Sequence, residues 1–370
     1  MKLMQSRPVY KFTDRAYYLD LPLLGLILVF ALFGLIILYS ASNQNMAMVS
    51  RQLIRLFCAF ILMVILACVP PHKYKVWTPW IYGLGLSLLL AVVVMGKIGK
   101  GAQRWLDLGL FRFQPSEIMK LAVPMMAAWV IDHKPLPIDS RSLMIAAMVI
   151  GIPAVLIAKQ PDLGTAIVVV LSGACVIFVA SLSARIITLG FIGMGLAAPL
   201  LWRVMHTYQK QRIMTMLYPE QDPLGTGYHI IQSKIAIGSG GAFGKGWLAG
   251  SQSHLNFLPE HATDFIFAVS GEEFGFIGAV CIILLVVAIT LRGLDTARSA
   301  QTTFTRLLAA SLIMTFFLSA FINMGMVMGI LPVVGIPVPL ISYGGSAMVT
   351  FLSGFGILMS IRSHRILFDI

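Results

Sequence analysis

Residues 21–41 read LPLLGLILVFALFGLIILYSA, an apolar run without a charged side chain. A transmembrane α-helix needs about 20 apolar residues in succession, so this stretch is long enough to cross a bilayer. The small residues Ser40-Ala41-Ser42 at its end also resemble the cleavage region of a secretory signal. The apolar core of a signal peptide spans only about 7–15 residues, however, and we therefore interpret residues 21–41 as a first membrane span.

Similar runs follow along the whole chain, which is 58% hydrophobic and only 11% charged. This composition predicts an all-α polytopic membrane protein with about ten transmembrane helices. The expected spans are residues 21–41, 52–69, 77–96, 115–132, 142–158, 164–182, 186–203, 264–291, 305–326 and 346–361. The eighth is the least regular, because Glu272 and Glu273 interrupt it. No internal repeat or linker divides the chain, so we expect residues 1–370 to form a single integral membrane domain.

The distribution of Lys and Arg near the span ends favours a cytoplasmic position for both termini. A long loop, residues 204–263, then lies outside the cytoplasm between spans seven and eight. The outer side keeps several cations, among them Arg212, Lys234 and Lys245. Anionic lipid headgroups are one explanation for these cations, and a bound anionic substrate is the other. The net charge of +12 does not indicate nucleic acid binding, because the cations are scattered along the chain.

Neither the cysteines nor the histidines show the spacing of a metal site. Cys58, Cys68, Cys175 and Cys281 all lie in apolar segments, and we interpret them as packing residues. The seven histidines form no HxxxH or HExxH pattern, so we expect no zinc site built by the protein, and the sequence identifies no ligands for another metal.

Charged residues near the outer ends of spans are the candidate site residues. Glu117 and Lys120 share a helix face at a depth where an unpaired ammonium is costly, although Glu117 in a first turn also suits the helix dipole. Asp162 stands in a Pro-Asp turn, where helix capping alone would explain it. Asp264 ends the glycine-rich stretch 227–264 and is either an N-cap or a catalytic carboxylate close to a ligand.

The stretch MGILPVVGIPVPLISYGGS, residues 328–346, contains three prolines, four glycines and no charge. Such irregular backbone at membrane depth has to be buried in protein or line a cavity, because lipid offers no hydrogen bonds.

Several motifs of this chain occur together in one family. They are GAQRWLDLG (101–109), FRFQPSEIMK (111–120), KQPDLGT (159–165), IIQSKIAIGSGGAFGKGW (230–247) and GIPVPLISYGGS (335–346). With these motifs the chain resembles the SEDS family (shape, elongation, division and sporulation) over nearly its whole length, and the 230–247 motif is closer to the elongation members than to the division members. One position departs from the family pattern. The family commonly has His directly before Thr-Asp-Phe, where this chain has Ala262, with His261 one place earlier.

The resemblance implies a ten-helix fold with both termini inside. It also implies a peptidoglycan glycosyltransferase that polymerises lipid II during cell elongation, at the outer (periplasmic) face of the bacterial inner membrane, and releases undecaprenyl pyrophosphate. The family's proposed catalytic aspartate falls on Asp264, and its substrate-binding positions fall on Glu117, Lys120, Asp162, Arg212, Lys234 and Lys245. The implied partners are a class B penicillin-binding protein, which is a single-span transpeptidase, and other elongation-complex proteins, besides lipid II and membrane lipids.

In this chemistry Asp264 would accept the proton of the attacking sugar hydroxyl, and cations would stabilise the leaving pyrophosphate. No motif requires a cofactor. A divalent cation, Mg²⁺ or Mn²⁺, could share the task of the cations, but the sequence shows no complete cage for one. Two other functions stay open at this stage: a transporter (flippase) for lipid-linked precursors and a non-enzymatic scaffold of the elongation machinery. The transporter predicts matched interrupted helices in the two halves of the chain.

Overall fold

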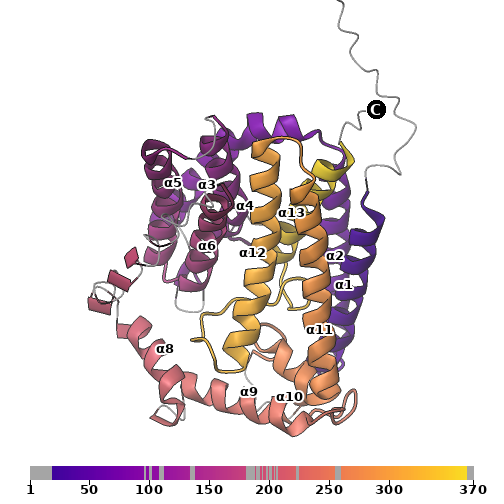
Figure 1. The fold of residues 1–370 in the computed structure, drawn as a ribbon. Coiled ribbons are helices and arrows are strands. Elements are labelled where there is room, and N and C mark those ends of the chain that lie inside the picture. Colours follow the sequence, from indigo (N-terminus) through magenta and orange to yellow (C-terminus); the bar gives the residue numbers. More distant parts are fainter. Residues whose placement is uncertain are drawn as a thin grey trace, which may run out of the picture.

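The computed structural model describes residues 19–95, 97–99, 102–107, 112–133, 138–180, 207–221, 225–254 and 260–364, with isolated positions between 188 and 205. The described helices are α1 (Leu21–Ala41), α2 (Met46–Ala67), α3 (Pro71–Met95), α4 (Pro115–Asp132), α5 (Ser140–Lys159), α6 (Leu163–Ala180), α8 (Thr207–Leu217), α9 (Thr226–Gly240), α10 (Ser251–His254), α11 (Ile266–Arg298), α12 (Thr303–Val327) and α13 (Ser346–Ser363), with a short 3₁₀ helix at Pro219–Gln221. The molecule is thus predominantly a helix bundle (Figure 1).

Among the described residues, eight helices are long and apolar enough to cross a membrane, namely α1, α2, α3, α5, α6, α11, α12 and α13. Helix α4 is also long enough, but it carries Glu117, Lys120 and Asp132. The predicted class, a polytopic α-helical membrane protein, is therefore confirmed. The predicted seventh span, residues 186–203, lies outside the described residues apart from isolated positions.

The helix boundaries follow local capping signals. Helix α4 begins and ends where the sequence predicts, with Pro115 in its first turn. Helix α2 starts at Met46 rather than at residue 52, because the side chain of Asn45 accepts a hydrogen bond from Met48 N and caps the helix there. Arg51 is exposed inside this helix, so a charged residue does not mark its boundary.

A small antiparallel sheet between α3 and α4 is the one addition to the predicted all-α architecture among the described residues. Its strands are β1 (Lys97–Gly99), β2 (Ala102–Asp107) and β3 (Arg112–Phe113), in the order β1-β2-β3. This segment contains several glycines and charged residues, so it is too polar to span the membrane. The sheet matters for function because β2 contacts both α3 and α4 and carries Arg104.

Helices α8, α9 and α10 lie across one end of the bundle, opposite to the end at which α13 finishes (Figure 1). They come from the predicted 204–263 loop. Helix α9 packs against α11 and α12, with Ile230, Ser233 and Ala236 fully buried. These helices therefore extend the core of the bundle rather than forming a core of their own.

The interpretation of the cysteines as packing residues is wrong for three of the four. Cys58, Cys68 and Cys281 are exposed on their helices, and Cys175 is half-buried. The outward surface of a membrane helix is itself apolar, so apolar neighbours in the sequence do not show which face of the helix is packed.

The segment between α12 and α13 folds back into the bundle without regular structure. Its apolar residues Val334, Ile336 and Leu340 are buried, whereas Gly335 and Tyr343 line a cavity. The prediction that this backbone is buried or lines a cavity is therefore confirmed.

Candidate functional site

A cavity of about 290 Å³ opens between segments that are far apart in the sequence. Its lining comes from β2, from the starts of α4, α6 and α13, from the turn before α11 and from the α12–α13 segment. The charged residues on this lining are Arg104, Glu117, Lys120, Asp162, Glu260 and Asp264. Four of the seven predicted site residues, Asp264, Glu117, Lys120 and Asp162, thus line one space.

Asp264 lies in the turn that precedes α11. The N-cap position of this helix falls on Phe265, so capping does not account for Asp264. The carboxylate of Asp264 approaches the backbone of Gly335, because a Cβ added to that glycine would lie 3.3 Å from Asp264 Oδ2. Gly335 also has φ of +73°, which disfavours any other residue. A glycine in the facing segment thus leaves room for the candidate base.

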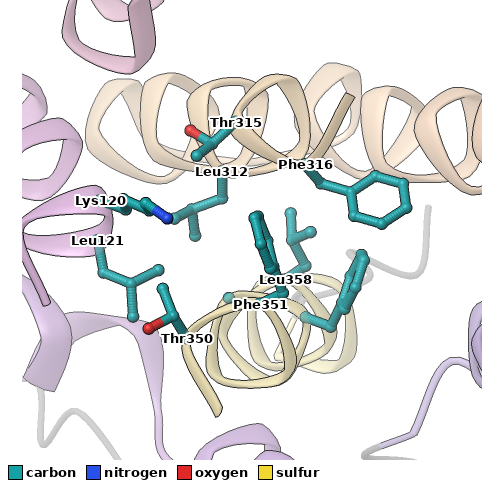
Figure 2. Close-up of a pocket in the computed structure, with 10 residues that line it drawn as sticks. Lys120, Leu121, Leu312, Thr315, Phe316, Thr350, Phe351 and Leu358 are labelled. Atoms are coloured by element: carbon teal, nitrogen blue, oxygen red, sulfur yellow. The ribbon is translucent and has the colours of Figure 1, made fainter. Parts of the chain in front are cut away.

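Glu117 and Lys120 form a buried ion pair on α4. Lys120 Nζ lies 2.6 Å from Glu117 Oε1, and the two residues are 2% and 5% exposed, respectively. The ammonium also lies 5.7 Å from the centre of the Phe351 ring, and Figure 2 shows Lys120 pointing between α12 and α13 towards this ring. Glu117 Oε2 is buried without a hydrogen-bond partner. The pair predicted from the sequence spacing exists, and one of its carboxylate oxygens is buried and unpaired in a residue that lines the cavity.

Asp162 connects the start of α6 with two other walls of the cavity. Its carboxylate accepts hydrogen bonds from Thr165 N (3.3 Å) and Gln114 Nε2 (2.7 Å). Arg104 Nη1 lies 3.9 Å from the same carboxylate, and the Arg104 side chain donates to the carbonyl of Gln160 (3.2 Å). Asp162 therefore caps a helix, as one interpretation of the sequence predicts, and its carboxylate also lies close to Arg104 at the cavity.

Arg212 on α8 is electrostatically coupled to the same site. Burial lowers the pKa of Arg212 below its usual value, and the positive charge of Arg104 lowers it further. Tyr208, Asp162 and Asp264 act in the opposite direction. Helix α8 thus brings a partly desolvated cation close to the two aspartates.

The structure does not place the other two predicted cations on this cavity. Lys234 is exposed on α9, where its side chain approaches Gly329. Lys245 Nζ lies 2.7 Å from the fully buried carboxylate of Glu272 and donates to Ser251 Oγ at 2.9 Å. Lys245 is thus engaged in an ion pair with α11.

Sequence reasoning missed several cavity residues. Arg104 is not among the predicted site residues, although its motif, GAQRWLDLG, contributes to the family resemblance. Gln114 and Tyr343 carry no charge and gave no signal of their own. Ala262 stands where the family commonly has a histidine. Its backbone carbonyl accepts a hydrogen bond from Tyr343 N at 2.9 Å.

The donor set does not fit a protein-built divalent cation site. Within the described residues, no group of three or more His, Cys, Asp or Glu side chains is arranged to hold a metal ion. The carboxylate of Asp162 is engaged with two donors, and Glu117 is paired with Lys120. Among the described residues, the cationic side chains on this cavity are those of Arg104 and Lys120.

Comparison with known proteins identifies the family. The family model for FtsW, RodA and SpoVE, described as a cell cycle protein, matches residues 16–366. The peptidoglycan glycosyltransferase MrdB of Escherichia coli (strain K12) is 49% identical over 355 residues, which cover 96% of each chain. Stage V sporulation protein E of Bacillus subtilis (strain 168) is 34% identical, over 93% of this chain and 97% of the relative.

Solved structures agree with the sequence matches. A chain from a peptidoglycan synthase complex that coordinates polymerization and crosslinking superposes with a TM-score of 0.81 at 30% identity, covering 93% of this chain and 97% of that one. The rod shape determining protein RodA of Thermus thermophilus superposes with a TM-score of 0.70 at 26% identity, covering 93% and 96% of the two chains. The chain therefore belongs to the FtsW/RodA/SpoVE family, which is the SEDS family.

Proposed function

We propose that this chain is a peptidoglycan glycosyltransferase that polymerises lipid II into glycan strands during cell elongation. The observation that carries the proposal is the cavity in which the carboxylate of Asp264 and the side chains of Arg104 and Lys120 line one space. Glycosyl transfer from a pyrophosphate donor needs this combination, a base for the acceptor and cations for the leaving group. The E. coli relative is itself named a peptidoglycan glycosyltransferase.

The reaction joins the 4-hydroxyl of a GlcNAc to the anomeric carbon of a MurNAc. The bond from that carbon to undecaprenyl pyrophosphate breaks, its electron pair leaves with the pyrophosphate, and the α-linkage is inverted to β. A sugar hydroxyl is too weak an acid to ionise at neutral pH, so a base has to accept its proton as the new bond forms. Asp264 is the proposed base, and such a base contributes about 10²–10⁴-fold to the rate.

Negative charge grows on the leaving pyrophosphate, and fixed cations in a site that excludes water stabilise it most strongly. Arg104 and Lys120 line the cavity, and the charge of Arg212 is coupled to that of Asp264. We assign these three residues to the leaving group. Lys234 and Lys245 are not assigned to the reacting centre, because neither lines the cavity.

Glu117 supplies an acceptor for the sugar. Its Oε2 atom is buried and has no hydrogen-bond partner, and the residue lines the cavity. A buried acceptor that stays unpaired costs about 1–3 kcal/mol. A hydroxyl or amide N–H of the saccharide would relieve that cost, so we assign Glu117 to binding the sugar while Lys120 neutralises its charge.

We further propose that the active site opens to the outer, periplasmic face of the bacterial inner membrane, in one integral membrane domain of ten spans with both termini in the cytoplasm. The charge distribution of the loops supports this orientation. The position of α8–α10 at the end of the bundle opposite to the end of α13 also supports it.

A class B penicillin-binding protein, which crosslinks the new strands, is the proposed partner within the elongation complex. Support comes from the peptidoglycan synthase complex that contains a chain similar to this one. Co-purification from native membranes under mild detergent conditions should recover a single-span transpeptidase. Purified chain that reaches full activity and never associates with one would contradict this proposal.

The central test is the Asp264→Asn variant, assayed for glycan chains made from purified lipid II in detergent. Asn is nearly isosteric with Asp but cannot accept the proton, so we expect a rate at least about 100-fold below wild type. Transport across a bilayer is impossible in detergent, so polymer formed by the wild-type protein also excludes a pure transporter or scaffold.

The matched control is Asp139→Asn. Asp139 caps α5 by accepting from Ser142 N at 3.3 Å, and it is not among the residues that line the cavity. Asn caps helices as well as Asp does, so the control should keep wild-type activity and thermal stability. Polymerisation at the wild-type rate by Asp264→Asn would move the search for the base to Glu117 or Asp162.

A further inference from the structure

Three consecutive carbonyls in front of α11 accept hydrogen bonds from α12 and from the α12–α13 segment. The carbonyl of Ala262 accepts from Tyr343 N at 2.9 Å, and that of Thr263 accepts from Ser342 Oγ at 2.6 Å. The carbonyl of Asp264 accepts from Asn323 Nδ2 at 2.8 Å. The backbone that carries the proposed base is thus attached residue by residue to α12 and to the α12–α13 segment.

Asn323 contributes the attachment closest to the base. It is fully buried near the end of α12, and its amide nitrogen also donates to the carbonyl of Ile336 at 2.6 Å. An amide group has two N–H donors, so both are used by carbonyls of different segments. The reversed amide would place its oxygen against two carbonyl oxygens, so the hydrogen bonds determine this orientation.

One acceptor is the backbone carbonyl of Asp264 itself, and the other belongs to the segment that the Asp264 carboxylate approaches. Ile336 directly follows Gly335, whose backbone approaches Asp264 Oδ2. Asn323 therefore fixes the distance between the base and the wall against which its carboxylate rests. Its Oδ1 atom is buried without a hydrogen-bond partner. An unpaired buried oxygen is costly, so an apolar side chain would fill the same space better. Donation to two backbone carbonyls, however, needs a group with two N–H donors, which the amide supplies.

We propose that Asn323 is a positioning residue, which sets the location of the Asp264 carboxylate by joining its backbone to Ile336. This inference rests on the proposed role of Asp264 as the base. Asn323 is not placed in contact with the substrate and acts through Asp264. Its loss should therefore reduce the rate of the chemical step and leave substrate binding largely unchanged, because the cations at the cavity stay in place.

The test is Asn323→Leu, a change that keeps the size of the side chain and removes both donors. With kcat and KM for lipid II measured separately, kcat should fall at least about tenfold and KM should stay within about threefold, since small displacements of a reacting group are costly. The matched control is Ser319→Ala, one turn earlier on α12. Ser319 is also fully buried, but its hydroxyl donates only to Thr315 O of the same helix. The control should leave kcat unchanged.

A double-variant cycle separates positioning from a general loss of structure. Single-turnover rates are compared for Asn323→Leu in the wild-type and in the Asp264→Asn backgrounds. If Asn323 acts through the base, its loss should have almost no further effect once the base is absent. If Asn323→Leu reduced the single-turnover rate by the same factor in both backgrounds, the inference would be overturned. A raised KM with unchanged kcat would overturn it as well.

Two further results keep this test decisive. If Asn323→Leu does not yield folded protein, Asn323→Ala, which also removes both donors, is put through the same cycle with the same expectations. If Asp264→Asn retains full activity, the proposed role of Asp264 fails. If Asp264→Asn is inactive while both positioning variants are normal, the inference fails alone.

Discussion

At the residue scale, the sequence predicted the groups whose chemistry is visible in a short motif. Glu117 and Lys120 were expected to pair because three residues along a helix bring side chains together, and the structure shows that pair. Asn323 could not be found this way. A neutral amide within an apolar span gives no indication of its acceptors, which lie in two other segments of the chain.

The buried pair leads to a prediction about coupling. Glu117→Gln and Lys120→Met should each reduce glycan synthesis, because removing one partner leaves the other charge buried and uncompensated. The double variant should lose less activity than the product of the two single losses, since it leaves neither charge behind. Initial rates of lipid II polymerisation measure this. Strictly multiplicative losses, or wild-type rates in both single variants, would instead favour a role for Glu117 confined to the helix dipole.

At the element scale, the kinked helix α11 explains why the eighth span looked irregular. Gly275 has φ of +64° and interrupts the helix, and four backbone hydrogen bonds join the break to the 241–246 loop. They run from Phe276 N to Gly241 O, from Ile277 N to Ala242 O, from Lys245 N to Glu272 O and from Gly246 N to Glu273 O. The apolar run in the sequence predicts this helix, but the break at Gly275 depends on the 241–246 loop, which comes earlier in the chain.

The two glutamates that interrupted the predicted span are buried at this break. Glu272 Oε1 accepts from Lys245 Nζ at 2.7 Å and from Ser251 Oγ at 3.0 Å. Ser40 Oγ on α1 donates to Glu273. Buried carboxylates are tolerated when they are paired or hydrogen-bonded. Lys245, which the family resemblance assigns to substrate binding, thus has a structural partner on the helix that Asp264 precedes.

The kink leads to a prediction about stability. In Gly275→Ala the new Cβ would lie 2.3 Å from Gly244 N, and the backbone would keep an unfavourable φ. The strained conformation alone costs about 1–3 kcal/mol, so the melting temperature of the purified protein should fall clearly. The control Gly238→Ala on α9 has no atom within 4 Å of its new Cβ. Equal melting temperatures for the two variants would show that the 241–246 loop does not constrain α11.

At the scale of the whole molecule, the membrane class and most spans could be predicted because long apolar runs have few other uses. The segments of α8 and α9 are predicted as loop, because their sequences are polar and glycine-rich. In the structure α9 packs on α11 and α12, and α8 packs on α9. The cavity itself was beyond prediction in detail. It forms where β2, α4, α6 and the α12–α13 segment come together, and a local sequence pattern does not indicate which distant segments contact one another.

The proposed orientation can be tested by cysteine labelling. Gln221 and Gln301 are both exposed, one in the predicted outer loop and one in the turn between α11 and α12. With the four native cysteines replaced, Gln221→Cys should react with an impermeant thiol reagent in intact spheroplasts, and Gln301→Cys should react only after the membrane is opened. The reverse pattern would invert the topology.

The attachment of Asp264 to α12 has a consequence for repeated turnover. Helix α12 is the most buried of the candidate spans, and a segment anchored to it has already lost its conformational entropy when the chain folds. A polymerase repeats one bond-forming step for every disaccharide it adds. If its base had to be ordered anew each time, that entropy would enter the barrier of every cycle. With the segment held from the core, the entropic cost is borne once per molecule and does not add to the barrier of each cycle of chain growth.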